Sequence, residues 1–380
     1  MLMRLARSKV PGSRLRYNRL GQACCLSSFP QHDDKVPVDR NSTLASIRYR
    51  NFPDAELYGL SNRYYRHMTT IDEEDALKRF DLLVQQGEIK WAQTEPVHRS
   101  VSDFDFEFRV IEAFANKPEN HDSDDEKSDS GASDQDGRRT KSDIRNDGPL
   151  FNIAEIGPHH DLVLNRFCVY RPQYILLTKN PVHDQHEPLD QADIAAALEL
   201  LHASSSPIFV IYNCGELAGC SRSHRHMQAF PSPGSKANTA KALFPDRLDQ
   251  IDEKKIPFKY YLFRFEDTKG APSEQQVDTI TKRYLSDLEK ARRILKIEKG
   301  DHIPHNVILT KQWLMVIPRR GGKVGGSAVN AAGMMGMVWT KNQDELKAWQ
   351  KLGIDESLAK FGVPRDEPDP EPEAQENGAL

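Results

Sequence analysis

The spacing of hydrophobic positions along the chain alternates between a helical period and short continuous apolar runs. Apolar residues three and four positions apart predict helices over 72–86, 191–202, 274–295, 344–352 and 356–361. Runs rich in β-branched and aromatic residues predict strands over 104–110, 162–169, 174–178, 207–212, 224–230, 260–265, 306–310 and 313–317. Helices and strands therefore alternate through the folded part of the chain.

Three segments lack this pattern. Residues 1–66 form an arginine-rich leader without an acidic residue before Asp33, which is typical of a mitochondrial transit peptide or of a disordered leader without an address. Residues 119–147 are almost all polar or charged and predict a disordered acidic insert that interrupts a domain. This insert is either a regulatory, protein-binding segment or a solvated loop without a role. Residues 365–380, rich in Pro and Glu, predict a disordered tail.

Composition restricts the classes of partner and compartment. The 380 residues carry a net charge of −4, so the surface as a whole does not favour nucleic acids or membranes, and anionic substrates require local basic groups. The five cysteines form no C-x-x-C pair and no disulfide or zinc spacing, which indicates a reducing compartment. No apolar run approaches the roughly 20 residues that cross a bilayer. We expect a cytoplasmic protein, unless the leader directs it to mitochondria.

The stretch 213–228 is the most informative for chemistry. If 224–230 is a strand, His224, His226 and Gln228 project from one face, because side chains alternate along a strand. An imidazole can attack phosphorus through one ring nitrogen while the other donates to a backbone carbonyl. The pattern therefore fits a nucleophile, although two histidines on a strand are also typical of zinc ligands or of structural histidines.

The loop before this strand suits phosphate groups. Gly215 and Gly219 allow the backbone N–H groups to approach phosphate oxygens, and Asn213 and Ser221 add small polar side chains. The sequence thus predicts a phosphate-binding loop beside the histidines.

The motif N-x-G-x-x-x-G-x-S-x-x-H-x-H-x-Q resembles the active-site motif of the histidine-triad superfamily, in the transferase branch where glutamine replaces the third histidine. Flanking sequence narrows the resemblance to the fungal-type ATP adenylyltransferases, also called diadenosine tetraphosphate (Ap4A) phosphorylases. The supporting segments are 162–169, 306–313, 318–319 and 330–336.

The resemblance implies a role for each matching position. His226 is the nucleophile that takes the nucleotidyl group, His224 orients it through its backbone, and Gln228 holds a phosphate oxygen. The positions implied to bind phosphate or nucleotide are Asn213, Gly215, Gly219, Ser221, Lys117 and Asn165. The chain departs from the family in carrying Arg166 where a lysine is usual.

The resemblance also implies the fold and its organisation. It implies an α+β fold of the histidine-triad and galactose-1-phosphate uridylyltransferase type, with helices packed on an antiparallel sheet that carries the site. Residues 67–235 form the implied catalytic nucleotidyltransferase domain, interrupted by the insert, and residues 236–364 the C-terminal ATP adenylyltransferase domain.

The implied reaction is Ap4A plus phosphate giving ATP plus ADP, and its reversal, through a nucleotidyl-histidine. No metal site on the protein is implied, and a divalent cation, Mg²⁺ or Mn²⁺, would arrive with the nucleotide phosphates. One alternative is a related transferase acting on adenylyl sulfate or a nucleotide sugar. Another is a regulator that binds nucleotides without turnover, against which the intact His226 and Gln228 argue.

Overall fold

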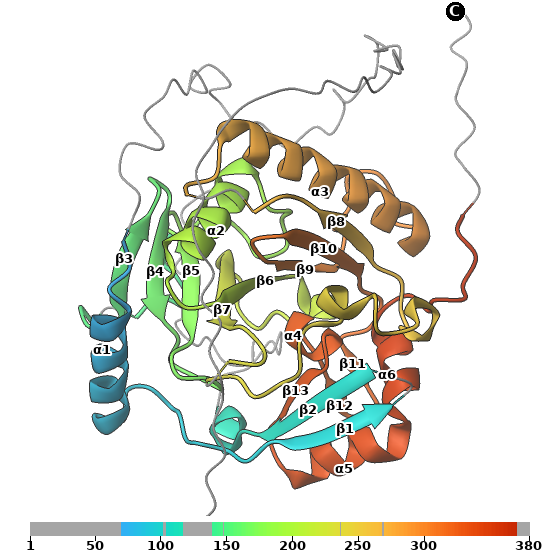
Figure 1. Cartoon of the computed structure of the whole chain (residues 1–380), viewed down its shortest axis with the longest axis horizontal. Helices are drawn as coiled ribbons and strands as arrows, with labels where there is room; N and C mark the ends of the chain where they lie inside the picture. Colours follow the sequence, from blue (N-terminus) through green and yellow to red (C-terminus); the bar gives the residue numbers. More distant parts are fainter. Residues whose placement is uncertain are drawn as a thin grey trace, which may run out of the picture. The chain divides into compact units, whose positions relative to one another are not determined.

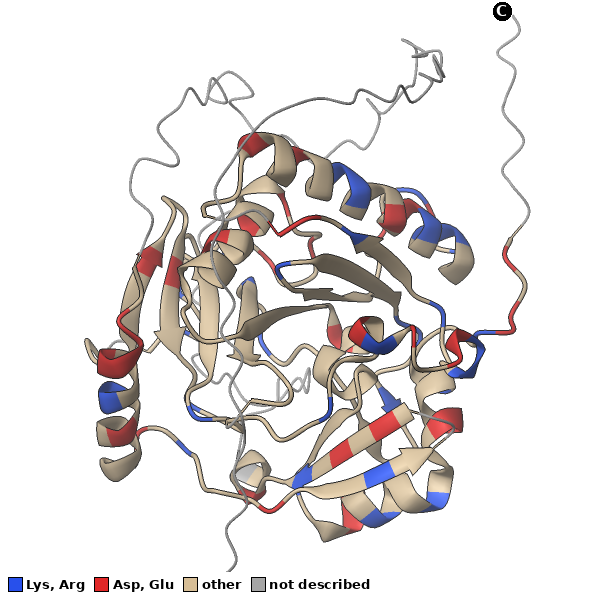
Figure 2. Cartoon of the chain, in the orientation of Figure 1, with Lys and Arg blue, Asp and Glu red and all other residues tan. Residues whose placement is uncertain are grey.

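An eight-stranded antiparallel sheet lies at the centre of the computed structural model (Figure 1). The structure describes residues 70–101, 104–116, 139–146, 148–235, 237–267 and 270–370. In spatial order the strands are β3 (Asn152–Ile156), β4 (His160–Leu164), β5 (Tyr174–Thr178), β7 (His226–Pro231), β6 (Ile208–Cys214), β9 (His305–Leu309), β10 (Trp313–Pro318) and β8 (Tyr261–Arg264). The central strands β5, β7, β6, β9 and β10 contain no Lys, Arg, Asp or Glu, as expected for a sheet covered on both faces (Figure 2).

Three helices cover one face of this sheet. They are α1 (Glu73–Gln85), α2 (Gln191–Ala203) and α3 (Glu274–Leu295). Each is preceded by a capping side chain, Asp72, Asp190 or Ser273, that accepts a hydrogen bond from the first helical turn. Their apolar sides share one core with alternate residues of β4, β5, β6, β7, β9 and β10.

The opposite face is covered by segments from both ends of the described chain. A second sheet joins β1 (Val97–Val101) and β2 (Phe104–Val110) to the late strand β13 (Met337–Thr340), which runs parallel to β2. The other elements on this side are β11 (Lys323–Val324), β12 (Ser327–Ala328), α4 (Ala331–Met334), α5 (Gln343–Leu352) and α6 (Ile354–Phe361). Phe108, Trp313 and Trp349 are buried in the core of this side.

The helices predicted from the hydrophobic spacing are confirmed, and α3, β2 and β5 have the predicted bounds. The strand predicted over 162–169 instead ends at Leu164. Residues beyond it leave the sheet and approach the end of α1, where the N–H of Lys90 donates to the carbonyl of Arg166 (2.7 Å). β1, β3 and β13 are not predicted by the pattern, because β1 is largely exposed, β3 is a short edge strand and β13 follows a glycine-rich stretch.

The domain boundary predicted after residue 235 divides the sequence but not the sheet. β6 precedes this boundary and β9 follows it, yet the two strands pair from Val210 and Leu309 to Cys214 and His305. All the described residues belong to one compact unit. The α+β class with an antiparallel sheet is confirmed. None of the described helices has the length and apolar character needed to cross a bilayer.

The disordered acidic insert is predicted over 119–147, and this predicted range extends too far at its C-terminal end. Residues 139–146 are described and lie against the sheet, where Ile144 packs on an apolar cluster of β4 and β5. Arg145 forms an ion pair with Asp161 of β4 (2.6 Å). Composition alone misplaces this boundary, because one apolar residue and a few charged ones find partners that only the fold provides.

Arg319, at the end of β10, joins the two sequence halves inside the fold. Its guanidinium is fully buried and donates to Asn306 Oδ1 (2.6 Å) and to the carbonyls of Ala218 (3.2 Å), Phe361 (3.1 Å) and Val329 (3.0 Å). The carbonyl of Ala218 belongs to the predicted phosphate loop, so the buried cation fixes this loop against β9 and α6.

Replacing Arg319 with Met should lower the free energy of unfolding by at least about 3 kcal/mol, because several buried oxygens lose their donor. Arg320→Met is the matched control. Arg320 is partly exposed and pairs with Glu367 (2.6 Å), so its loss should cost less than about 1 kcal/mol. Urea denaturation of both variants measures the difference, and equal losses would contradict the role given to Arg319.

Candidate active site

β7 brings two polar side chains to one cavity. Its pairing with β5 sets His226 opposite Leu177 and Gln228 opposite Ile175. His226 and Gln228 both line a cavity of 370 Å³ on the face away from α2, as the alternation predicts. His224, the third residue of the alternation, precedes the strand, is fully buried and does not line this cavity.

The ring of His226 is oriented by the backbone of His224. Nδ1 of His226 lies 2.7 Å from the carbonyl oxygen of His224, so this nitrogen carries the proton and donates it. The same tautomer places the ring's lone pair on Nε2, which is the atom that can attack an electrophile. This contact is the backbone orientation implied by the sequence motif.

His224 is a neutral residue held by hydroxyl groups. Burial, and secondly the neighbouring His226, lower the pKa of His224 to about 4. Ser142 Oγ accepts from two backbone N–H groups of its own turn, so its hydroxyl donates to Nδ1 of His224 (2.7 Å). Nε2 of His224 therefore carries the proton and donates toward Thr178 Oγ1 (2.8 Å) and the carbonyl of Asn180 (3.2 Å).

The segment 139–146 also holds the backbone that leads into β7. The carboxylate of Asp143 accepts from the N–H groups of Ser223 (2.6 Å) and His224 (3.0 Å). Part of the expected insert therefore belongs to the site.

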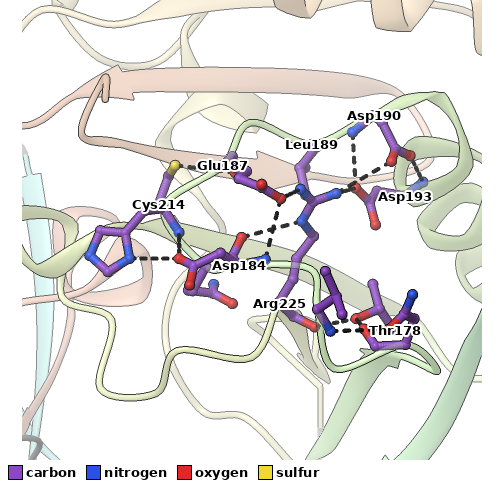
Figure 3. A network of polar contacts seen from close by, with 12 residues as sticks. Thr178, Asp184, Glu187, Leu189, Asp190, Asp193, Cys214 and Arg225 are labelled. Carbon is purple, nitrogen blue, oxygen red and sulfur yellow. Dashed lines mark hydrogen bonds and ion pairs between the residues drawn. The ribbon is translucent and has the colours of Figure 1, made fainter. Parts of the chain in front are cut away.

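Arg225, between the two histidines in the sequence, points toward Asp190 and Asp193 and anchors this stretch to the start of α2 (Figure 3). It is 4% exposed, donates to Asp193 (2.9 Å) and Asp190 (3.3 Å), and pairs with Glu187. Burial acts to raise the pKa of Asp193, but the hydrogen bond with His160 (2.8 Å) and the charge of Arg225 lower it to about 2. The network is thus charged at neutral pH.

Basic side chains make the 370 Å³ cavity suitable for binding an anion. Arg145, Arg166 and Arg222 line it together with Asn165, and Asp143 is the acidic residue of its wall. Three guanidinium groups favour a phosphate ester in this space, since each can donate to phosphate oxygens.

The amide of Gln228 is oriented by a buried glutamine, Gln173. Gln173 Nε2 donates to Gln228 Oε1 (3.3 Å), and Gln173 Oε1 accepts from the N–H of Val169 (2.9 Å). Because Oε1 of Gln228 accepts from Gln173, Nε2 of Gln228 can act as a donor in the cavity that His226 lines.

A larger cavity of 670 Å³ lies on the other side of Ser221 and Arg222, which line both cavities. Its lining combines an apolar part with basic groups: Phe114, Met337, Trp339, Lys323 and Lys341. An aromatic surface beside lysines suits a nucleoside that carries phosphates.

Two of the residues predicted to line the phosphate channel do not reach either cavity. Asn213 is buried, and its Oδ1 accepts from Asn306 Nδ2 (3.0 Å) and from the N–H of Ala331 (2.9 Å). Gly215 has φ of +81°, and a Cβ there would overlap the imidazole ring of His302. Both residues therefore stabilise the conformation of the loop: Asn213 through its hydrogen bonds, and Gly215 by allowing His302 to approach the backbone.

The other predicted residues divide between the cavities. Gly219 lines the larger cavity, Asn165 lines the smaller one, and Ser221 lines both. Gly219 has φ of +86°, and a Cβ there would lie 2.7 Å from the carbonyl of Val329, so no side chain fits. Lys117 lies outside the described residues.

Several residues of the site carry no signal in the sequence: Ser142, Asp143, Gln173, Gln185, Thr178 and Arg225. Arg225 lies at an unspecified position of the motif and the others come from loops and strands far from it, and none has a spacing that distinguishes it from other polar residues. Within the described part of the chain, no group of three or more His, Cys, Asp or Glu side chains is arranged to hold a metal ion.

Two family descriptions match the sequence in succession. Residues 73–245 match the Ap4A phosphorylase N-terminal domain, and residues 254–364 match the ATP adenylyltransferase C-terminal domain. Together they account for most of the chain.

Individual relatives agree with these matches. Diadenosine 5',5'''-P1,P4-tetraphosphate phosphorylase 2 of Saccharomyces cerevisiae is 24% identical over 231 residues, which cover 54% of this chain and 70% of the relative. Protein APA1 of the same yeast is 26% identical over 212 residues, 49% of this chain and 62% of the relative. The crystal structure of yeast Ap4A phosphorylase Apa2 superposes with a TM-score of 0.61 at 18% identity, covering 78% of this chain and 96% of that one. The crystal structure of Apa2 in complex with Ap4A superposes with a TM-score of 0.60 at 19% identity, covering 78% of this chain and 99% of that one.

Histidine NMR should separate His224 from His186, a partly buried histidine of the same region. His224 should stay neutral from pH 8 to pH 5 and titrate near pH 4, whereas the hydrogen bond with Asp184 raises the pKa of His186 above its ordinary 6.5. Because the folded pKa of His224 lies below that of the unfolded chain, its contribution to stability is lost as pH falls from 6.5 toward 4. A midpoint for His224 at or above 6.5 would contradict the hydroxyl contacts assigned to its ring.

Proposed function

Because the chain belongs to the family of Ap4A phosphorylases and ATP adenylyltransferases, we propose that it cleaves Ap4A with phosphate to give ATP and ADP through a nucleotide carried on His226. The observation that supports this most directly is the 2.7 Å contact between His226 Nδ1 and the carbonyl of His224, on the wall of a cavity lined by three arginines. This contact prepares Nε2 as a nucleophile in a place where phosphate groups are attracted.

The proposed reaction has two displacements at one phosphorus. Nε2 of His226 attacks an α-phosphorus of Ap4A, the N–P bond forms, and the bond to the bridging oxygen breaks so that ATP leaves with the electron pair. An oxygen of inorganic phosphate then attacks the same phosphorus, the N–P bond breaks, and ADP leaves. Gln228 donates to a non-bridging oxygen, and the arginines offset the charge that develops there.

We assign the two cavities to the two parts of Ap4A. The AMP that is transferred lies in the 370 Å³ cavity beside His226, and the remaining nucleotide passes Ser221 and Arg222 into the 670 Å³ cavity. The size and aromatic lining of the larger cavity favour a second nucleoside over a small leaving group such as sulfate, which supports Ap4A against adenylyl sulfate.

Two further properties are proposed on chemistry and composition. A divalent cation, Mg²⁺ or Mn²⁺, would enter with the polyphosphate, because such ions prefer phosphate oxygens and retain waters. The protein would act in the cytoplasm, with the basic leader as the segment that would direct a mitochondrial pool; this leader lies outside the described residues.

His226→Ala should abolish phosphorolysis of Ap4A and its reversal, because removing the nucleophile eliminates both displacements. In the wild-type protein, withholding phosphate should trap AMP on the chain. Peptide mapping should locate it on His226, as a phosphoramidate that survives mild base and breaks in acid.

His224→Ala is the companion variant. It should retain a reduced rate, because the backbone carbonyl that orients His226 remains while the packing of the buried ring is lost. Nucleotide found on His224, or full phosphorolysis by His226→Ala without any adduct, would overturn the assignment in favour of direct attack by phosphate.

The cavity assignment predicts that two partial reactions respond differently to one variant. Exchange of labelled phosphate into ADP requires only the smaller cavity, because phosphate is then the leaving group. The double variant Lys323→Ala and Lys341→Ala should therefore raise the KM for Ap4A about tenfold or more, by removing two cations from the polyphosphate path, and leave ADP exchange nearly unchanged.

Lys351→Ala, an exposed lysine of α5 that lines neither cavity, is the control for loss of surface charge. It should alter neither reaction. Equal loss of both reactions in the double variant would show that the larger cavity does not receive the leaving nucleotide.

A further inference from the structure

The strands β6 and β7 separate just before the nucleophile. Their backbone pairing runs from Ile208 and Pro231 to Ile211 and Gln228, where it ends. If the register continued, Asn213 would face His226 across the pair. The sheet is therefore open on one side of His226 at the level of the cavity.

The side-chain amide of Gln185 occupies this opening. Its Nε2 donates to the carbonyls of Asn213 (3.0 Å) and His226 (3.1 Å), and its Oε1 accepts from the N–H of His226 (2.7 Å). One side chain thus satisfies both the N–H and the C=O of His226, as the backbone of a neighbouring strand normally would.

Gln185 is itself fixed from two sides. It is 1% exposed, its N–H donates to the carbonyl of Ser223 (2.8 Å), and its carbonyl accepts from the N–H of Gly215 (3.2 Å) and the hydroxyl of Tyr212 (3.1 Å). These partners lie at both ends of the loop 215–223. The amide therefore has a rigid frame from which to hold His226.

We propose that Gln185 is a positioning residue for the nucleotidyl transfer, which sets the place of the His226 backbone and with it the line along which Nε2 attacks. The inference rests on the proposed function, since the transfer to His226 is the step being positioned. Gln185 lines neither cavity, so it does not contact the nucleotide. Its effect should fall on the rate of transfer and not on nucleotide binding, because misplacing a reacting atom by about 1 Å can cost ~100-fold in rate.

Gln185→Met tests this with a side chain of similar length and no hydrogen bonds. The single-turnover rate at which Ap4A labels the protein should fall about 10- to 100-fold, while the Kd for AMP stays within about twofold of wild type. Gln312→Met, at an exposed position outside both cavities, is the control and should change neither quantity.

Gln185→Glu provides a second measurement, the pH dependence of the transfer rate, which would not change if Gln185 had only a structural role. An ionised carboxylate would face the carbonyl oxygens of Asn213 and His226, which repel it, so transfer should be slow at pH 8. As pH falls toward 5.5, the carboxyl becomes protonated, donates to one carbonyl and still accepts from the N–H of His226. The rate relative to wild type should therefore rise at least fivefold between pH 8 and pH 5.5.

The outcomes separate the two proposals. Wild-type protein that forms no adduct would reject the proposed function, whereas wild-type labelling that Gln185→Met leaves unchanged would reject only the role of Gln185. If the Met variant does not fold, the Glu variant decides: a ratio to wild type that is constant with pH overturns the inference, and a ratio that rises in acid supports it.

Discussion

One hydrogen bond, from Nδ1 of His226 to the carbonyl of His224, is the constraint on which the site depends. It fixes the tautomer of the proposed nucleophile and the rotation of its ring, because the donor nitrogen must face a carbonyl only two residues away. The rest of the site keeps that carbonyl in place. Asp143 accepts from the N–H of His224, and hydroxyl groups bind the ring of His224. Arg225, the residue between the two histidines, is bound to α2 through Asp193.

Buried polar groups hold this geometry, although removing them from water has an unfavourable desolvation free energy. Arg225 and Arg319 are almost completely inaccessible, and each donates to several oxygens from different parts of the chain. A satisfied polar network tolerates few alternative arrangements, since a displaced donor leaves an unpaired group in a medium of low dielectric. An apolar core of the same volume would allow more adjustment of the loop between β6 and β7.

The parts of this structure that the sequence predicts are those with local causes. The helix α3 follows from the spacing of apolar residues, and the shared face of His226 and Gln228 follows from strand alternation. The supports of the nucleophile have non-local causes: Gln185 lies 41 residues from His226, and Asp143 lies 81 residues from His224. No local pattern marks a residue whose partner is so distant. The same reason explains why Asn213 looked like a phosphate ligand, since its partners lie on β9 and α4.

The wall formed by Ser221 and Arg222 has a stereochemical and kinetic consequence. In an in-line displacement the departing group lies opposite the attacking nitrogen, so in the proposed reaction the bond to ATP breaks on the side of Ser221 and Arg222, and phosphate must later approach the phosphorus from that side. Each displacement inverts the configuration at phosphorus, and two in succession restore it. ATP must leave before phosphate can take the position that the terminal phosphate of ATP occupied, so ATP competes with phosphate for the labelled protein. The proposed cycle is therefore ping-pong, with ATP released as the first product.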